Sequence, residues 1–243
     1  MTRWTDGAAC FFNPRPKLSL WPLGSGAHCI VADGVLADPE GLVAWAARQA
    51  FGPPAGYPYP GLVLDAPSEV TQRVADFFAQ HVRGALGARR TLDLSVRLSM
   101  VTLPPAELEP LQWLCHRDRI DDTGRLLFAA AVLYLFHDTS LGGTSFYRPR
   151  LHAAETDHLV ADSQRLDAAA FGARYGLQAG YMGDGNAYFE RIASVPAAWN
   201  RMIFYDGSLF HSADVPDPSR LVADPAAGRL TLNGFFTCTR KAV

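Results

Sequence analysis

The sequence predicts a mainly β protein with flanking helices, built as an antiparallel sandwich or barrel. After Arg90 the chain consists of short segments in which apolar and polar residues alternate with a period of two, which is typical of half-buried strands. Turn residues separate these segments, and a helical pattern of crossover length occurs only around residues 162–176. A doubly wound parallel sheet needs a helix between successive strands, so the pattern favours antiparallel pairing.

The β core is expected over about residues 91–243. Its strand patterns lie at residues 91–103, 111–118, 125–136, 142–149, 201–207, 210–215 and 229–240. Residues 152–200 interrupt the core as a helical insertion with a glycine-rich loop. Such an insertion at a barrel mouth is either a substrate lid or a decoration without a catalytic part, and the sequence does not decide between them.

A mostly helical layer is expected over about residues 1–90, after a Pro/Gly-rich start and with a strand at 28–36. Asp38 followed by Pro39 is typical of a helix start and predicts a helix over residues 39–50. A second helix is expected over residues 66–86, with Ser68 as its N-cap. Its apolar face would consist of residues at helical spacing: Val70, Val74, Phe77, Phe78 and Val82. No linker separates this layer from the core, so residues 1–243 are expected to form a single domain.

The composition excludes several classes of function. The net charge is −2, the pI is about 6.4 and no Lys/Arg run occurs, so nucleic acid is not expected as a partner. No apolar run has the length of a membrane span, and the N-terminal residues lack the pattern of a secretory signal. We therefore expect no membrane association and a cytoplasmic location. The four cysteines, Cys10, Cys29, Cys115 and Cys238, form no CxxC pair and are expected to be reduced, buried thiols.

His116 and Asp118 raise the question of a metal site. Side chains two apart on a strand point to the same face, so these two would converge while Arg117 points away. Both cost free energy in a core unless something binds them. A histidine and a carboxylate supply two ligands of a facial-triad ferrous site, and a distant histidine can supply the third. Alternatively, His116 is a hydrogen-bonded core residue and Asp118 merely begins a polar turn.

Two later segments carry further polar candidates. His211 begins a strand after a glycine turn. Arg229, Thr231 and Asn233 share one face of a strand whose other face is apolar. A guanidinium can hold a carboxylate through two parallel hydrogen bonds, so this face favours an anion bound inside the barrel. The alternative is a surface face with an ordinary ion pair.

Taken in chain order, these segments resemble the Fe(II)/2-oxoglutarate-dependent dioxygenases, most closely their prolyl-hydroxylase-like branch. The matching stretches, within about residues 95–240, are HRD (116–118), YLFHDTSLGGTSFYR (134–148), MIFYDGSLFHSADV (202–215) and RLTLNGFF (229–236). The resemblance implies a double-stranded β-helix, the cupin-like jelly-roll barrel. It also implies an iron ion held by His116, Asp118 and His211, which would be the catalytic residues. It transfers no particular substrate.

The resemblance further implies a cofactor site and a reaction. The far carboxylate of 2-oxoglutarate would meet Arg229, with Thr231 and Tyr134 adding hydrogen bonds. With O₂, the enzyme would hydroxylate an amino acid, a peptide or a small natural product and release succinate and CO₂. Related halogenases carry a small residue in place of the carboxylate, so Asp118 favours hydroxylation or another oxidation.

Several alternatives stay open at this point. Arg220 is a rival of Arg229 for the carboxylate, but it lies in a Pro/Asp loop whereas Arg229 opens a regular strand. The chain could be a non-catalytic jelly-roll binding or scaffold protein. It could also be a cupin-like metal enzyme, such as an isomerase or hydrolase, that does not use 2-oxoglutarate. The oligomeric state is not predicted.

Overall fold

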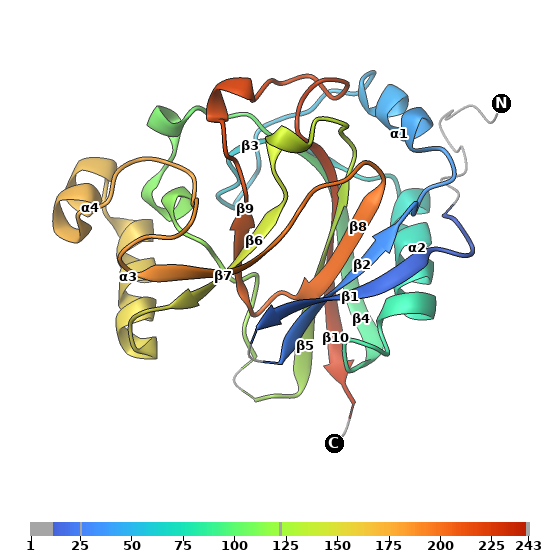
Figure 1. Ribbon diagram of the computed structural model, residues 1–243, viewed down its shortest axis with the longest axis horizontal. Coiled ribbons are helices and arrows are strands. Elements are labelled where there is room, and N and C mark those ends of the chain that lie inside the picture. The colour runs from blue at the N-terminus through green and yellow to red at the C-terminus, as the bar shows by residue number, and fades with distance from the viewer. Residues whose placement is uncertain (1–11, 25, 122, 242–243) are drawn as a thin grey trace.

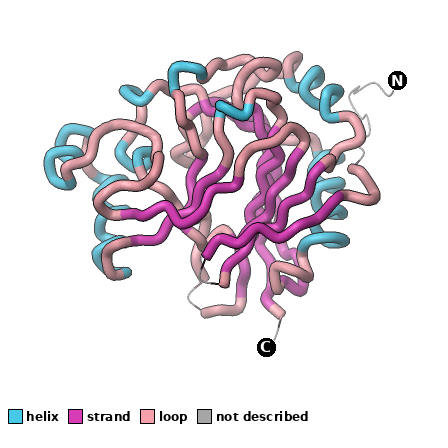
Figure 2. The backbone as a smooth tube through the Cα atoms, in the orientation of Figure 1, coloured by secondary structure: helices cyan, strands magenta, loops and turns pink. Residues whose placement is uncertain are grey.

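Two antiparallel β-sheets form the body of the protein (Figures 1 and 2). The computed structural model describes residues 12–24, 26–121 and 123–241. In these ranges the larger sheet has seven strands in the order β1-β2-β8-β5-β10-β4-β3, and the smaller has three in the order β7-β6-β9. The strands are β1 (Lys17–Gly24), β2 (Ala27–Asp33), β3 (Gly61–Asp65), β4 (Ala88–Val101), β5 (Leu126–Tyr134), β6 (Thr144–Pro149), β7 (Phe189–Val195), β8 (Arg201–Asp206), β9 (Phe210–Ala213) and β10 (Leu230–Arg240).

The chain alternates between the two sheets as in a jelly roll. β4 lies in the larger sheet, and His116 then forms a bridge to His211 at the edge of the smaller one. β5 returns to the larger sheet, β6 and β7 pair in the smaller, and β8, β9 and β10 alternate again. This order confirms the predicted mainly β fold, a double-stranded β-helix with flanking helices.

Helices cover the outer faces of both sheets. The first pair is α1 (Pro39–Ala46) and α2 (Ser68–Phe77), the latter continued by a π-helical turn (Phe78–Val82), and it packs on the larger sheet. There the Phe78 ring stacks on Phe236 of β10 with centroids 3.9 Å apart. The second pair, α3 (Ala153–Arg165) and α4 (Ala168–Tyr175), packs on the other side of the molecule, beside β7 (Figure 1).

The N-terminal region is less helical than predicted. β1 and β2 extend one edge of the larger sheet through pairing of β2 with β8, and β3 extends the other edge through β4. Asp38 caps α1 as expected, because its side chain accepts a hydrogen bond from the backbone nitrogen of Gly41 at 2.9 Å. Ser68 is not the N-cap of α2. The carbonyl of Pro67 already accepts the first helical hydrogen bond, from Thr71, so the helix begins one residue earlier than the cap prediction requires.

Two core segments also differ from the prediction. Residues 111–118 do not form a strand, because Pro110 begins a 3₁₀ turn (Pro110–Trp113) closed by a capping box between Glu109 and Gln112. The segment 152–200 is not all insertion, because its last part is the core strand β7. Its helical part contains two helices rather than one, since the Asp167 side chain caps α4. A single domain over residues 1–243 and a lid role for the helices stay predictions.

The thiols and the helix lengths add two findings. Cys29, Cys115 and Cys238 are free and buried, and burial raises the pKa of the Cys29 thiol to about 12. Cys10 lies outside the described residues. Within the described ranges no helix has the length and apolar character needed to cross a bilayer.

Candidate metal centre and its cavity

His116 and His211 face each other across two neighbouring backbone segments. Each donates its backbone N–H to the carbonyl of the other at 2.9 Å, and the ring centroids lie 4.4 Å apart. Asp118 is attached to the same hairpin, because its backbone N–H donates to the carbonyl of Gly207 at 2.8 Å. The turn between β8 and β9 therefore holds residues 116–118 in place, although they form no regular strand.

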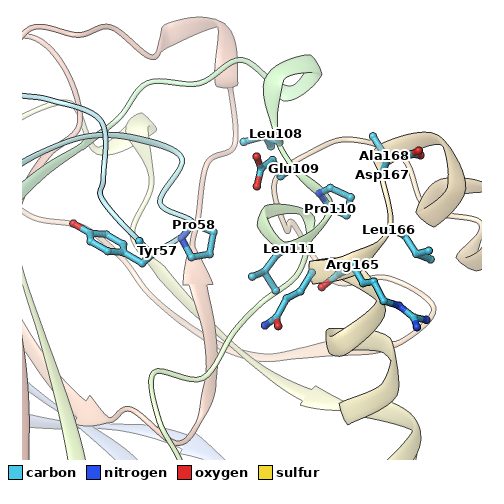
Figure 3. A pocket seen from close by; sticks show the side chains of 13 residues that line it. Tyr57, Pro58, Leu108, Glu109, Pro110, Leu111, Arg165, Leu166, Asp167 and Ala168 are labelled. Carbon is cyan, nitrogen blue, oxygen red and sulfur yellow. The ribbon is translucent and has the colours of Figure 1, made fainter.

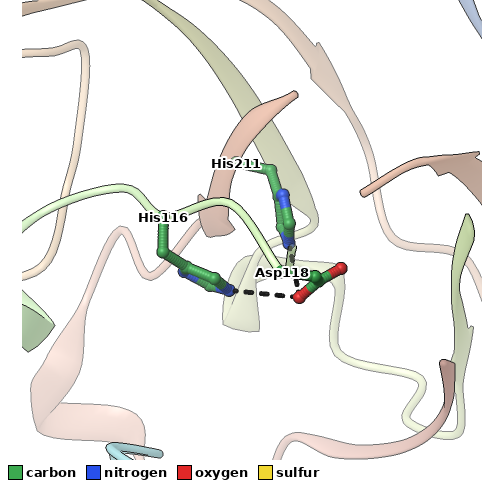
Figure 4. A group of neighbouring side chains, drawn as sticks. All are labelled: His116, Asp118 and His211. Atoms are coloured by element: carbon green, nitrogen blue, oxygen red, sulfur yellow. Dashed lines mark ion pairs between the residues drawn. The ribbon is translucent and has the colours of Figure 1, made fainter. Parts of the chain in front are cut away.

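The three side chains converge on one point (Figure 4). The Nε2 atoms of His116 and His211 each lie 3.8 Å from Oδ1 of Asp118, and all three ligand atoms lie within 4.8 Å of one another. These separations exceed hydrogen-bonding distance, so the groups face a common space without satisfying each other. The structure thus brings together all three residues that were predicted as metal ligands.

The hydrogen bonding of His211 determines which ring nitrogen is available. Its Nδ1 lies 2.8 Å from the backbone carbonyl of Leu209, which can only accept, so Nδ1 carries the proton. The lone pair is then on Nε2, the nitrogen that faces Asp118. Burial lowers the pKa of His211 to about 4, so the ring is neutral near pH 7 and able to bind a metal ion.

Asp118 is the other unusual group of the centre. Its Oδ2 is buried and has no hydrogen-bond partner among the described residues, and burial raises the pKa of the carboxyl. An unpaired buried carboxylate oxygen is costly, and coordination of a cation would remove that cost. Two imidazole nitrogens and one carboxylate oxygen around a common space are the donor set of a facial-triad site for a divalent ion. The residues present therefore fit such an ion.

The centre lies in a cavity of about 700 Å³ between the sheets. Arg229 lines this cavity and is buried, with 3% of its surface exposed. Its Nε donates to the carbonyl of Leu141 at 3.0 Å, and its Nη2 donates to that of Gly143 at 2.6 Å. The chain comes close to its neighbours at this turn, and a Cβ at Gly142 (φ +80°) would lie 1.9 Å from the carbonyl oxygen of Asp214. The glycine pair thus allows the turn that fixes the guanidinium.

Thr231 lines the cavity as well, whereas Tyr134 lies behind its wall. The Thr231 hydroxyl donates to the carbonyl of Ser99 at 3.3 Å and accepts from Asn233 at 3.1 Å. The hydroxyls of Tyr134 and Thr144 lie 2.8 Å apart, and Thr144, not Tyr134, belongs to the lining. Tyr134 therefore reaches the cavity only through Thr144.

Arg220, the rival candidate, lies elsewhere. It does not line the cavity, and about half of its side chain is exposed. Its guanidinium pairs with Asp138 at 2.5 Å and donates to the hydroxyl of Ser140. Arg220 therefore belongs to a surface loop cluster, and of the two candidates only Arg229 lines the cavity that contains the candidate metal centre.

Sequence reasoning missed two parts of the cavity. Residues 57–60, part of the predicted loop, line the cavity, and no periodicity marks their position. Arg97 lines it from β4, where the alternation with Ser95 and Ser99 would have been a usable signal.

A second hollow of about 800 Å³ lies outside this cavity, formed by residues 56–58, 108–111 and 163–168 (Figure 3). The two spaces share Tyr57, Pro58, Leu111 and Gln164 and so lie side by side.

Comparisons with known proteins place the chain in a sequence family and beside several solved structures. The profile of a family of unknown function, DUF6445, matches residues 14–236. No curated protein is significantly similar in sequence. HygX from Streptomyces hygroscopicus, solved with nickel, 2-oxoglutarate and hygromycin B bound, is 13% identical with a TM-score of 0.48, over 87% of this chain and 83% of its own. SnoN, a non-heme alpha ketoglutarate dependent epimerase from nogalamycin biosynthesis, is 15% identical with a TM-score of 0.45, over 88% and 81% of the two chains.

Proposed function

The chain belongs to DUF6445, a family of unknown function, and we propose from its own site that it is a non-haem Fe(II)- and 2-oxoglutarate-dependent oxygenase. The observation that supports this best is the meeting of two imidazoles and a carboxylate in the same cavity as a buried arginine. A scaffold protein has no need of a desolvated carboxylate without a partner. The site is suited to a metal ion and to a ligand that carries a carboxylate.

The chain's own residues have distinct roles in this proposal. His116 and His211 would hold the iron ion through their Nε2 atoms, and Asp118 would hold it through its carboxylate. When bound, iron and 2-oxoglutarate supply with O₂ the oxidising chemistry, and the reaction releases succinate and CO₂.

Arg229 binds the far carboxylate of 2-oxoglutarate. Its guanidinium has five N–H donors, of which the carbonyls of Leu141 and Gly143 use two. The guanidinium is therefore fixed before the ligand arrives, which lowers the entropy lost on binding. Thr231 adds a hydrogen bond to the ligand, and Tyr134 supports the site through Thr144. Burial raises the pKa of Tyr134 well above its usual range, so its hydroxyl stays protonated.

The proposed reaction is the hydroxylation of an amino acid, a peptide or a small natural product, as in the prolyl-hydroxylase-like branch. A volume of about 700 Å³ is in the range of small-molecule sites. It has room for 2-oxoglutarate and a compact substrate, and the outer hollow can accept a part of the substrate that extends outward.

Formation of succinate from 2-oxoglutarate tests the proposal. The full chain with Fe(II), 2-oxoglutarate and O₂ should release succinate slowly even without a substrate. Arg229→Gln should lower the rate at limiting 2-oxoglutarate by roughly tenfold or more, because a charge-assisted pair is lost. Arg220→Gln is the matched control and should match the wild type. Fe(II) binding without any turnover of 2-oxoglutarate would contradict the proposal and favour a cupin-like metal enzyme.

A further inference from the structure

Arg97 is one of four arginines that line the cavity, and the proposed function leaves it without a role. It lies on β4 opposite Asn233 of β10, on the face that lines the cavity. Its guanidinium carbon lies 4.0 Å from the ring centroid of Tyr57 and 4.5 Å from that of Phe235. Two aromatic rings thus hold the guanidinium plane without using any of its N–H groups.

One donor of Arg97 is left unsatisfied in the described part of the chain. Its Nε is buried and has no hydrogen-bond partner, and the guanidinium forms no ion pair there. A buried donor without a partner costs free energy, and an anion in the plane of the guanidinium would remove that cost. Arg117, by contrast, lines the same cavity but pairs with Asp157 at 3.0 Å.

Arg97 and Arg229 are held by different parts of the cavity wall. Tyr57 (Figure 3), which contacts Arg97, lines both the inner cavity and the outer hollow, so Arg97 lies near the boundary between the two spaces. Arg229 is 3% exposed and held by the turn at residues 142–143. Tyr59 lies near both, since each guanidinium acts to lower the pKa of its phenol, although burial raises that pKa to about 12.

The charged side chains that line the cavity also favour a bound anion in addition to 2-oxoglutarate. Four arginines and two aspartates line the cavity: Arg97, Arg117, Arg119, Arg229, Asp93 and Asp118. Arg117 is already paired with Asp157, so the lining keeps an excess of one positive charge. A divalent cation and the dianion 2-oxoglutarate would neutralise each other and leave this excess unchanged. A ligand that completes the site should therefore bring negative charge, and Arg97 is the lining arginine whose buried Nε has no partner among the described residues.

We propose that Arg97 binds a carboxylate of the organic substrate, and hence that the substrate is a small carboxylic acid whose body is apolar or aromatic. The planar fork of Arg97 matches the two oxygens of a carboxylate, and the neighbouring rings of Tyr57 and Phe235 suit an apolar body. This inference rests on the proposed function, because it assigns the substrate to the arginine that 2-oxoglutarate does not use.

The test compares the binding of an acid and its amide in variants of Arg97 and of Arg229. Binding of phenylacetate and of its neutral isostere phenylacetamide is measured by calorimetry on the full chain, alone and with Ni(II) and 2-oxoglutarate. Phenylacetate should bind at least about tenfold more tightly than the amide. Arg97→Gln should abolish this preference and leave 2-oxoglutarate binding close to that of the wild type. Arg229→Gln should weaken the binding of 2-oxoglutarate and leave the preference for phenylacetate unchanged.

Matched variants distinguish a loss of binding from a loss of folding. Arg90→Gln changes an exposed arginine of the same strand, and it should leave both affinities unchanged. Arg97→Lys keeps the charge and should retain part of the preference, with the unfolding temperature of each variant recorded. Equal binding of acid and amide, or a preference that survives Arg97→Gln, would overturn the inference. Failure of 2-oxoglutarate to bind while the preference persists would instead contradict only the proposed function.

Discussion

His116 and His211 form a directly opposed backbone pair, in which each N–H donates to the other's carbonyl at 2.9 Å. The register of the two ligands is therefore set by main-chain hydrogen bonds and not by their imidazoles. Removal of either ring should leave this pairing intact. The candidate metal centre can thus be altered one ligand at a time without loss of the fold.

Gly207→Ala should weaken metal binding without unfolding the protein. A Cβ at this position would lie 2.6 Å from Oδ2 of Asp118 and 3.2 Å from the carbonyl oxygen of Phe128, so the carboxylate must move. We expect the affinity for Fe(II) or Ni(II) to fall by roughly 10–100-fold, as for other displaced ligands. Gly180→Ala, where a Cβ meets nothing within 4 Å, is the control. Equal metal affinity in the two variants would show that Asp118 is not a ligand.

Asn200→Ala should destabilise the attachment of the N-terminal region to the β core. The Asn200 side chain accepts from the backbone nitrogen of Leu36 and donates to its carbonyl, both at 2.8 Å. Loss of both buried bonds should lower the free energy of unfolding by about 2–4 kcal/mol, measured by chemical denaturation.

The backbone of Asn200 provides an internal control. Its φ of 58° lies in the left-handed region, which alanine tolerates poorly and glycine readily. Asn200→Gly should therefore be less destabilised than Asn200→Ala, although both lose the same hydrogen bonds. If Asn200→Gly were less stable than Asn200→Ala, the left-handed backbone at this position would not be what penalises alanine.

Asp162→Asn should lower stability near neutral pH but not in acid. The buried carboxylate accepts from Tyr175 at 2.8 Å and from Arg165 at 2.7 Å, and these bonds, that of Tyr175 foremost, hold its pKa below the usual range. A lowered pKa in the folded state gives stability that is present above the unfolded pKa of about 4 and is lost as the pH falls through the folded value. Thermal unfolding at pH 7 and pH 3 should show a gap between variant and wild type that closes in acid. A gap of constant size would mean that the ionised form is not what stabilises the pair of helices α3 and α4.

The predicted parts of the structure depend on regular alternation. On β10 the residues Leu230 and Leu232 belong to the core on the side of the helices, while Thr231 and Asn233 line the cavity. This strand lies between β4 and β5, and because its two faces meet different surroundings, the period of two is clear in the sequence. The same reasoning found the core strands β4, β5, β6, β8 and β9.

The missed parts depend on contacts between distant segments. His116 and Asp118 do meet, but not because a strand places them on one face. A 3₁₀ turn precedes them, and the hairpin of β8 and β9 positions them through Gly207 and His211. The position of β7 is likewise set by its pairing with β6, and that of Tyr57 by its contact with Arg97. Such contacts between distant segments leave no local pattern in the sequence.

Metal binding to single-ligand variants tests the central claim most directly. Calorimetric titration of the anaerobic full chain with Fe(II) should give one ion per chain for the wild type. His116→Ala and His211→Ala should each lower the affinity by more than about 100-fold, because removal of a ligand costs more than removal of its supporting group. Their unfolding temperatures should stay near that of the wild type in the absence of metal. Wild-type affinity in either variant, with the fold intact, would contradict the account.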